Sequence, residues 1–222
     1  RPPRSTQSRS SAASDVYKRQ GERRSLGAAR TTDILSRLSL AHLQLCQGQG
    51  IELRSGRDAR LGPRDVLAIQ ALKTAPAFEA ALYTGLRAAG AAPQEALLHR
   101  FSLLLGEGYQ ILNDLEDWDT DGEGKVHPGG DAALSRPTIL RAFALEAGGP
   151  AVLEAADGAA EVGTRLEITR RVFTETGAFD KAGELLRRLR ERALDAAGSF
   201  SGAPLRELLS FLVRVVLDHG GR

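Results

Sequence analysis

The sequence predicts an all-α protein, and three observations support that prediction. Ala, Leu and Arg, which rank high in helix propensity, are abundant. Apolar residues recur at helical spacing over several long segments, and no segment alternates with period two for long enough to predict a strand. The 222 residues, 42% of them hydrophobic and 26% charged, are enough for one sizeable core. We therefore expect a single bundle of helices.

The first expected helix runs from Thr31 to Leu53, with Thr31 or Thr32 as its N-cap. Its apolar stripe follows the spacing i, i+4, i+7, i+11, and consists of Ile34, Leu38, Ala41 and Leu45. The same face continues through Gln49 and Glu52. Because the stripe becomes polar partway, we expect Gln49 and Glu52 to line a cavity.

The second expected helix begins at Pro63, in the first-turn position that tolerates proline, and stops near Gly90. It meets Pro76 in its interior, where the ring removes one backbone hydrogen bond. A kink is therefore predicted just beyond Lys73 and Thr74.

The third expected helix runs from Pro93 to about Trp118, and Trp118 is expected to pack against the helix end. Its predicted buried face comprises Leu97, Phe101, Leu104, Ile111 or Leu112, and Leu115. Two or three further helices are expected between Thr138 and Asp218. The clearest of these carries Ala182, Leu186, Leu189 and Ala193 at helical spacing.

The polar face of the third helix gives the strongest functional signal. It carries Gly106, Gln110, Asn113 and Asp117 at i, i+4, i+7, i+11, with Asp114 beside them. Further acids follow at the helix end, near the negative pole of the helix dipole. Each like-charge pair costs about 0.2–0.5 kcal/mol on an exposed helix, and a bound divalent cation would reverse that cost. Carboxylate oxygens suit Mg²⁺, which takes its remaining ligands from water and substrate phosphates.

Several short motifs resemble those of the trans-polyprenyl diphosphate synthases. Residues 110–117 (QILNDLED) resemble the second aspartate-rich motif of that family, usually written DDxxD, with a glutamine three residues ahead of it. The other pieces occur in the family's order between Leu26 and Leu217. They are Gly48-Gln49 with Glu52 (the GQ segment), Lys73-Thr74 (the KT motif), and Gly124-Lys125, Gly130-Asp131 and Arg136-Pro137-Thr138 (the GK…GD…KxT region).

This resemblance implies an isoprenoid-synthase-type bundle that couples an allylic prenyl diphosphate to isopentenyl diphosphate, in a homodimer. It implies that Mg²⁺ is held by Asn113, Asp114 and Asp117. The implied diphosphate-binding residues are Lys73, Thr74, Gln110, Lys125 and Arg136, and the implied catalytic residues are Lys73, Gln110 and Asp114.

Three departures from the family pattern qualify that expectation. Asn113 replaces the first aspartate of the motif, and Arg136 replaces the usual lysine. The family's first aspartate-rich motif, which lies upstream of the GQ segment, has no counterpart in the printed sequence. We therefore expect the C-terminal part of such a synthase, a bundle incomplete at its N-terminus. This chain alone should be inactive and should expose apolar helix faces.

Residues 1–20 are rich in Ser, Arg and Pro, show no apolar periodicity, and resemble a translated sequencing adapter. We set them aside as an artefactual or disordered tail, with residues 21–222 as the partial synthase domain. The alternative is a basic arm that touches nucleic acid. Removing their five basic and one acidic residues from 30 and 28 leaves 25 and 27, a net charge of −2. No nucleic-acid partner is therefore expected.

Other interpretations of the acidic run remain open. Asn113, Asp117 and Asp121 are also spaced like the metal triad of class I terpene cyclases. Four residues match the start of an EF-hand loop, whose twelfth position is Pro128 instead of glutamate. The run could also be a solvated helix end, or part of a helical module that binds diphosphate or cations without catalysis.

The remaining features concern the cellular compartment, one histidine and the membrane. The single cysteine, Cys46, cannot form an internal disulfide, which favours a reducing cytoplasm, and its side chain is expected to be buried. His42 is expected to be a hydrogen-bonded core histidine. No uninterrupted apolar run reaches the roughly 18 residues of a membrane span.

Overall fold

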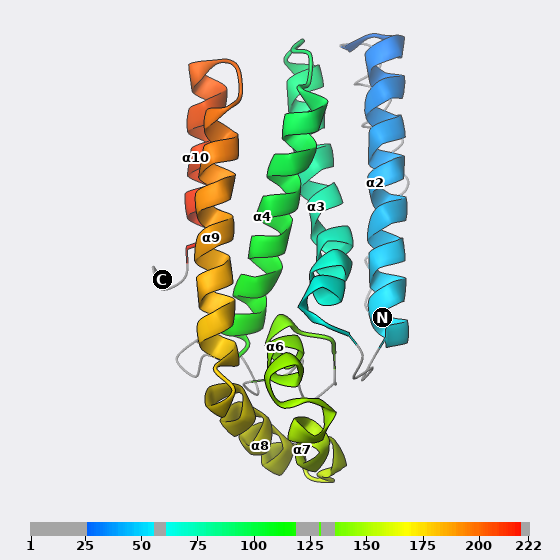
Figure 1. Cartoon of the computed structure of the whole chain (residues 1–222). Coiled ribbons are helices and arrows are strands. Elements are labelled where there is room, and N and C mark those ends of the chain that lie inside the picture. The colour runs from blue at the N-terminus through cyan, green and yellow to red at the C-terminus, as the bar shows by residue number, and fades with distance from the viewer. Residues whose placement is uncertain (1–25, 56–60, 119–128, 130–135, 219–222) are drawn as a thin grey trace, which may run out of the picture.

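The computed structural model describes residues 26–55, 61–118, 129 and 136–218. Every regular element within these ranges is a helix, as the sequence predicts. The long helices α2 (Ala28–Ser55), α3 (Pro63–Ala88), α4 (Glu95–Glu116) and α9 (Ala178–Gly198) stand side by side, and α10 (Ala203–Val216) packs against α9 (Figure 1). The packing order is α2 on α3, α3 on α4, and α4 on α9. Residues 1–20 lie outside the described ranges.

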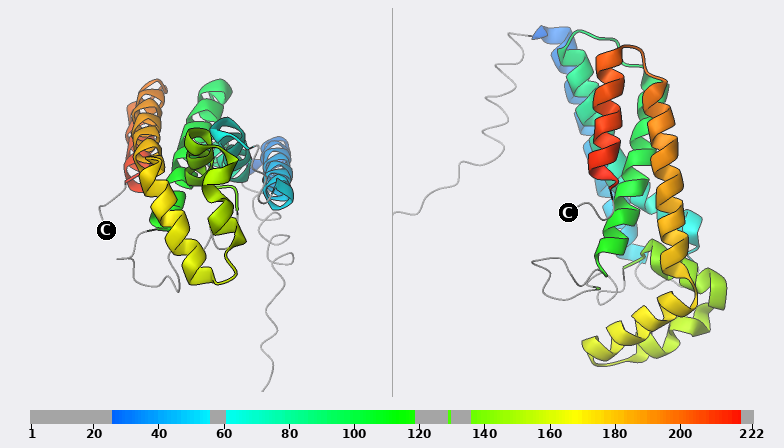
Figure 2. Two further views of the ribbon diagram at one scale, coloured as in Figure 1. Left: turned by 60° about the horizontal axis from the view of Figure 1, so that its bottom comes forward. Right: turned by 90° about the vertical axis from the view of Figure 1, so that its left-hand side faces the viewer.

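The shorter helices form a cap at one end of this row (Figures 1 and 2). They are α6 (Ile139–Gly148), the 3₁₀ turn η1 (Pro150–Leu153), α7 (Glu154–Gly158) and α8 (Val162–Glu175). The prediction of two or three helices after Thr138 is therefore wrong, since α6 to α10 and η1 are found among residues 139–216. The two shortest elements, α7 and η1, span too few residues to show a helical period.

Helix α2 begins earlier than expected, and its buried face is narrower than the predicted apolar stripe. It starts at Ala28, and the Thr31 hydroxyl donates a hydrogen bond to the Gly27 carbonyl at 2.9 Å, so the predicted N-cap is wrong. Its buried residues are Thr31, Ile34, Ala41, Gly48 and Glu52. Leu38 is 41% exposed, because the side that faces α3 is a narrow stripe with a spacing close to seven residues.

Helix α3 confirms the predicted start at Pro63 and ends at Ala88, close to the predicted end near Gly90. The Gly62 backbone N–H donates to Asp65 Oδ2 at 2.9 Å, which satisfies one amide at the helix start. The helix continues unbroken through Pro76, which is itself buried.

The core lies mainly between α4, α6, α8, α9 and α10. Phe101, predicted for the buried face of α4, is fully buried and makes an edge-to-face contact with Phe200, with 6.1 Å between ring centroids. Trp118 is buried at the end of α4 and packs edge-on against Phe173 of α8 and Phe179 of α9. The prediction that Trp118 packs the helix end is confirmed, and α9 buries all four of its predicted residues.

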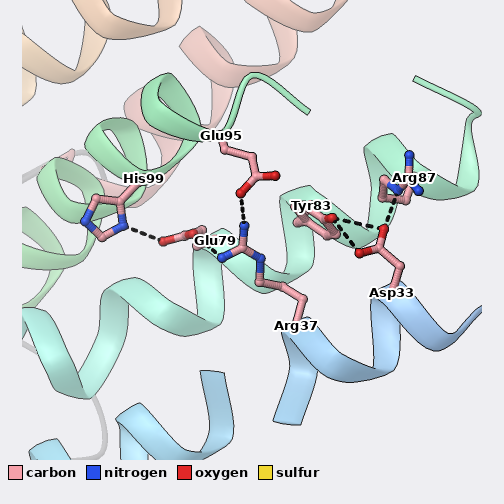
Figure 3. A network of polar contacts seen from close by, with 7 residues as sticks. All are labelled: Asp33, Arg37, Glu79, Tyr83, Arg87, Glu95 and His99. Atoms are coloured by element: carbon pink, nitrogen blue, oxygen red, sulfur yellow. Dashed lines mark hydrogen bonds and ion pairs between the residues drawn. The ribbon is translucent and has the colours of Figure 1, made fainter. Parts of the chain in front are cut away.

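A network of polar contacts links α2, α3 and α4 at the end of the bundle opposite the cap (Figure 3). It joins side chains of α2, α3 and α4 through Asp33, Arg37, Glu79, Tyr83, Arg87, Glu95 and His99. Tyr83 donates to Asp33 Oδ1 at 2.9 Å, and burial together with that carboxylate raises the pKa of the Tyr83 hydroxyl. The phenol therefore remains a donor, which holds α2 against α3.

Two predicted burials on α2 are wrong. Cys46 is exposed, and so is His42, whose Nε2 lies 3.7 Å from Cys46 Sγ. Both fall outside the narrow stripe that faces α3. Within the described ranges, no helix combines the length and apolar composition that a bilayer crossing requires.

Candidate functional site

The candidate site lies in the half of the bundle nearer the cap, where α3 runs between α2 and α4. Lys73 of α3 forms an ion pair with Glu52 of α2, and the Glu52 side chain is 8% exposed. Gln49 Nε2 donates to the other Glu52 oxygen at 2.8 Å. Of the two residues predicted to line a cavity, Glu52 is in direct contact with the lysine of the KT-like motif, whereas Gln49 is exposed and contacts Glu52.

A second contact joins the KT-like motif to the third helix. Gln110 Nε2 of α4 donates to Thr74 Oγ1 of α3 at 2.6 Å. Thr74 is buried and Gln110 is half-buried. Two residues that are 36 positions apart in sequence thus meet across the α3–α4 contact.

Among the described acids of the aspartate-rich run, Asp114 is the most deeply buried, at 5% exposure. Its Oδ2 accepts a hydrogen bond from Gln70 Nε2 of α3 at 2.8 Å and from the Ile139 backbone N–H of α6 at 2.7 Å. Ile139 is the first residue of α6, so the carboxylate also lies at the positive end of a helix dipole. Asp114 therefore joins three helices.

Two glycines allow these helices to approach one another closely. A Cβ on Gly48 would lie 2.8 Å from the Lys73 nitrogen, and a Cβ on Gly106 would lie 2.7 Å from the Ala75 nitrogen. Both distances are shorter than real Cβ contacts allow. The glycines of the GQ-like segment and of the third helix therefore set the spacing of α2, α3 and α4 around Lys73 and Thr74.

The predicted metal ligands offer oxygen donors but no closed cage. Asn113 and Asp117 are half-buried and one turn apart on α4, with Asp114 buried beside them. No group of three or more His, Cys, Asp or Glu side chains converges anywhere in the described part of the chain. An amide oxygen and one or two carboxylates fit Mg²⁺, which typically binds few protein ligands and completes its shell with waters and phosphate oxygens.

The motif order and this geometry agree with a comparison against known protein families. Residues 11–164, well over half of the chain, match the family described as polyprenyl synthetase. The chain belongs to the polyprenyl synthetase family. The matched range begins at residue 11, within the Ser-, Arg- and Pro-rich residues 1–20.

Individual relatives of this polyprenyl synthetase are distant in sequence. The chain is 26% identical over 200 residues to the octaprenyl diphosphate synthase of Escherichia coli (strain K12), a match that covers 87% of this chain and 61% of that protein. The chain thus spans about three fifths of the length of the curated relatives it matches.

Solved structures show the same fold. A polyprenyl synthetase from Streptomyces coelicolor A3(2) superposes with a TM-score of 0.76 at 23% identity, covering 87% of this chain and 61% of that chain. A decaprenyl diphosphate synthase from Rhodobacter capsulatus gives 0.72 at 22% identity, covering 86% and 60%. The predicted isoprenoid-synthase-type helical bundle is therefore confirmed.

The GK…GD…KxT region of this polyprenyl synthetase is described only at its end. Lys125, Gly124 and Gly130-Asp131 lie outside the described residues, as does Asp121, which both the EF-hand and the terpene-cyclase alternatives require. Arg136 is exposed, and Thr138 is the N-cap of α6, accepting a hydrogen bond from the Arg141 N–H at 3.2 Å. Arg136 also lines a small cavity with Arg141, Arg165 and Asp157.

Sequence reasoning missed Gln70, which is 3% exposed and bonded to Asp114. One signal could have identified it. Gln70 precedes Lys73 and Thr74 by one helical turn, and a polar residue there interrupts an otherwise apolar stretch of α3.

Proposed function

We propose that this polyprenyl synthetase is, in its natural form, a Mg²⁺-dependent prenyltransferase that condenses an allylic prenyl diphosphate with isopentenyl diphosphate. The observation that carries the proposal is the pairing of motif residues from three helices. Glu52 contacts Lys73, and Thr74 contacts Gln110, so the GQ-like, KT-like and aspartate-rich segments form one continuous polar region. A surface of unrelated polar residues would not bring these three segments together in this way.

The proposed roles follow from the chemistry of each side chain. Lys73 supplies a cation, Thr74 and Gln110 supply hydrogen bonds, and Arg136 adds a second cation for the diphosphate, with Lys125 as a further proposed contact. A diphosphate next to acidic residues is repelled by several kcal/mol per charge pair at an intermediate dielectric unless cations intervene. Lys73 and Arg136 reduce that repulsion.

Magnesium would be held by Asn113, Asp117 and Asp114, and when bound it supplies positive charge that stabilises the departing diphosphate. The Asp114 carboxylate would take part while its Oδ2 accepts the two hydrogen bonds from Gln70 and Ile139. Asn113 keeps an oxygen donor but removes one negative charge, so this site should hold Mg²⁺ more weakly than a motif with three aspartates.

Isothermal titration calorimetry tests the site directly. Geranyl diphosphate, as an allylic probe, should bind the 222-residue chain in the presence of millimolar Mg²⁺, and binding should weaken when EDTA replaces the metal. Lys73→Met should weaken it further, whereas Lys181→Met, on α9, should not. No binding by the unaltered chain would overturn the proposal.

Turnover is a separate measurement. The printed sequence holds one aspartate-rich motif of this type. We therefore propose that this chain alone, mixed with Mg²⁺, an allylic diphosphate and isopentenyl diphosphate, forms no elongated product. Measured elongation would contradict that part of the proposal, and prenyl diphosphate binding without turnover would agree with a diphosphate-binding helical module.

The same resemblance supports two finer proposals. We propose that the natural protein forms a homodimer and acts in the cytoplasm. Sedimentation measurements on the natural protein would test the first, and localisation of a tagged copy would test the second.

A further inference from the structure

Gln70 is a buried amide in a position where an apolar residue would pack at less cost. It is 3% exposed on α3, against α4. Burying an amide is unfavourable unless its polar atoms are hydrogen-bonded. Gln70 Nε2 donates to Asp114 Oδ2 at 2.8 Å, while Gln70 Oε1 has no hydrogen-bond partner among the described residues. The contribution of this side chain therefore lies in its donor, and the donor is directed at Asp114.

Asp114 also contacts a third helix, α6, so the hydrogen bond from Gln70 affects the position of α6. The same Oδ2 accepts from the Ile139 backbone N–H at 2.7 Å. The first-turn amides of a helix have no partner within the helix. Thr138 accepts from the Arg141 N–H, and Asp114 supplies the acceptor for Ile139. Two bonds to one buried carboxylate oxygen thus fix the start of α6 relative to α3 and α4.

The three residues lie next to the proposed binding residues in each segment. Gln70 lies one turn before Lys73 and Thr74, and Asp114 lies between Asn113 and Asp117. Ile139 follows Arg136 by three residues. A shift of any one of these segments would therefore change the distance between a proposed diphosphate contact and a proposed metal ligand.

We propose that Gln70 is a positioning residue, which holds the Asp114 carboxylate and, through it, the start of α6 in the arrangement that binds a metal-bound diphosphate. This role rests on the proposed function. Gln70 itself touches neither the diphosphate nor the metal. It acts through Asp114. The orientation of the Asp114 carboxylate determines how its oxygens face the proposed metal site and where α6, which follows Arg136, begins.

The test compares Gln70→Met with the unaltered chain, because methionine keeps the length of the side chain and removes the donor. Calorimetric titration of inorganic pyrophosphate in excess Mg²⁺ should show about tenfold weaker binding for Gln70→Met. Ser102→Ala is the matched control and should bind like the unaltered chain, because it removes a buried hydroxyl that has no hydrogen-bond partner among the described residues. Thermal unfolding of each variant confirms that folded proteins are compared.

Amide hydrogen exchange provides a second readout that needs no ligand. In the unaltered chain the Ile139 amide should be protected although it is in the first turn of α6, and Gln70→Met should accelerate its exchange more than that of amides in the middle of α9. Unprotected Ile139 in the unaltered chain would overturn the inference. So would equal pyrophosphate affinity in Gln70→Met, while leaving the proposed function intact. Absence of binding by the unaltered chain would instead overturn the proposed function, and the positioning role with it.

Discussion

The side-chain amide of Gln110 and the hydroxyl of Thr74 lie 2.6 Å apart and join α4 to α3 at the centre of the candidate site. The donor is an amide, so the Thr74 oxygen acts as the acceptor in this contact. We propose that the Thr74 O–H, which is not the donor in this contact, donates to the anionic diphosphate. The contact therefore orients a residue proposed to bind the substrate.

Replacing Thr74 should weaken both the fold and the site. Thr74→Val removes the acceptor of the Gln110 amide at nearly constant volume, which should lower the free energy of unfolding by about 1 kcal/mol. Pyrophosphate binding in Mg²⁺ should weaken as well. Urea denaturation and calorimetry measure the two effects. Thr84→Val is the matched control, because the buried Thr84 hydroxyl has no hydrogen-bond partner among the described residues and its loss should be neutral or stabilising. Equal effects of the two substitutions would contradict the assignment.

The Glu52–Lys73 ion pair predicts strong coupling between two helices. Both side chains are largely buried, so Lys73→Met leaves Glu52 without its cation and should destabilise the fold by roughly 3 kcal/mol. Glu52→Gln should cost less, because glutamine can still accept from Gln49. The double variant should recover part of the loss, and a thermodynamic cycle from chemical denaturation measures the coupling. Additive effects of the two substitutions would show that the pair does not form.

Adding a methyl group at Gly48 should separate α2 from α3. Its Cβ would lie 2.8 Å from backbone atoms of Leu72 and Lys73, which cannot move as a flexible side chain can. Gly48→Ala should therefore lower the free energy of unfolding by about 1–3 kcal/mol. Gly50→Ala, two residues away on the same helix, meets nothing within 4 Å and should stabilise by about 0.5–1 kcal/mol. Thermal melts of the two variants should shift in opposite directions, and a common direction would argue against the close approach.

Glu107 should make the stability of the protein depend on pH. Burial raises the pKa of this carboxyl from its ordinary value near 4.5, although Arg192 opposes the shift. The folded state therefore favours the protonated form, and this group costs stability as the pH rises from 4.5 through the folded pKa. Glu107→Gln should be more stable than the unaltered chain at pH 7, by an amount of the order of 0.5 kcal/mol, and equally stable near pH 3.

Glu184 provides a control, because its pKa is shifted in the opposite direction to that of Glu107. Arg187 lowers the pKa of the Glu184 carboxyl, so its stabilising effect is present above its ordinary pKa and is lost as the pH falls. Glu184→Gln should therefore not stabilise the protein at pH 7. Denaturation curves at both pH values distinguish the two residues. Parallel pH profiles for Glu107→Gln and the unaltered chain would contradict the first prediction.

The sequence predicted the long helices well, because their apolar residues repeat over many turns. Phe101 in α4 and Leu186 in α9 are buried as their spacing requires. Prediction from the sequence failed where the burial of a side chain depends on a helix that lies far away in sequence. Leu38 fits a helical stripe yet lies exposed, since α3 covers only the side of α2 that carries Ile34 and Ala41.

The site residues were predicted as separate motifs, and their contacts were not. The pattern predicted that Glu52 lines a cavity, but its pairing with Lys73 depends on how α2 lies against α3, which no local spacing specifies. Gln70 interrupts an apolar stretch and could have been singled out, but its acceptor could not, because Asp114 is 44 residues away. The oxygen that Asp114 uses for Ile139 could not be foreseen, because that bond depends on where α6 begins.

Exposed leucines on α2, on the side that does not face α3, lead us to predict that the chain self-associates. Leu40 and Leu43 are 47% and 54% exposed and lie one turn apart, and contiguous exposed apolar side chains favour association or poor solubility. Replacing both with glutamine removes the apolar contact without disturbing the stripe that faces α3. We expect the unaltered chain to sediment as concentration-dependent larger species and the Leu40→Gln/Leu43→Gln variant to sediment largely as a monomer, with its free energy of unfolding changed by no more than about 0.5 kcal/mol. Val162→Gln changes a comparably exposed side chain on α8 and should leave the association unaltered. A monodisperse, cooperatively unfolding monomer for the unaltered chain would show that exposed leucines on α2 do not drive association.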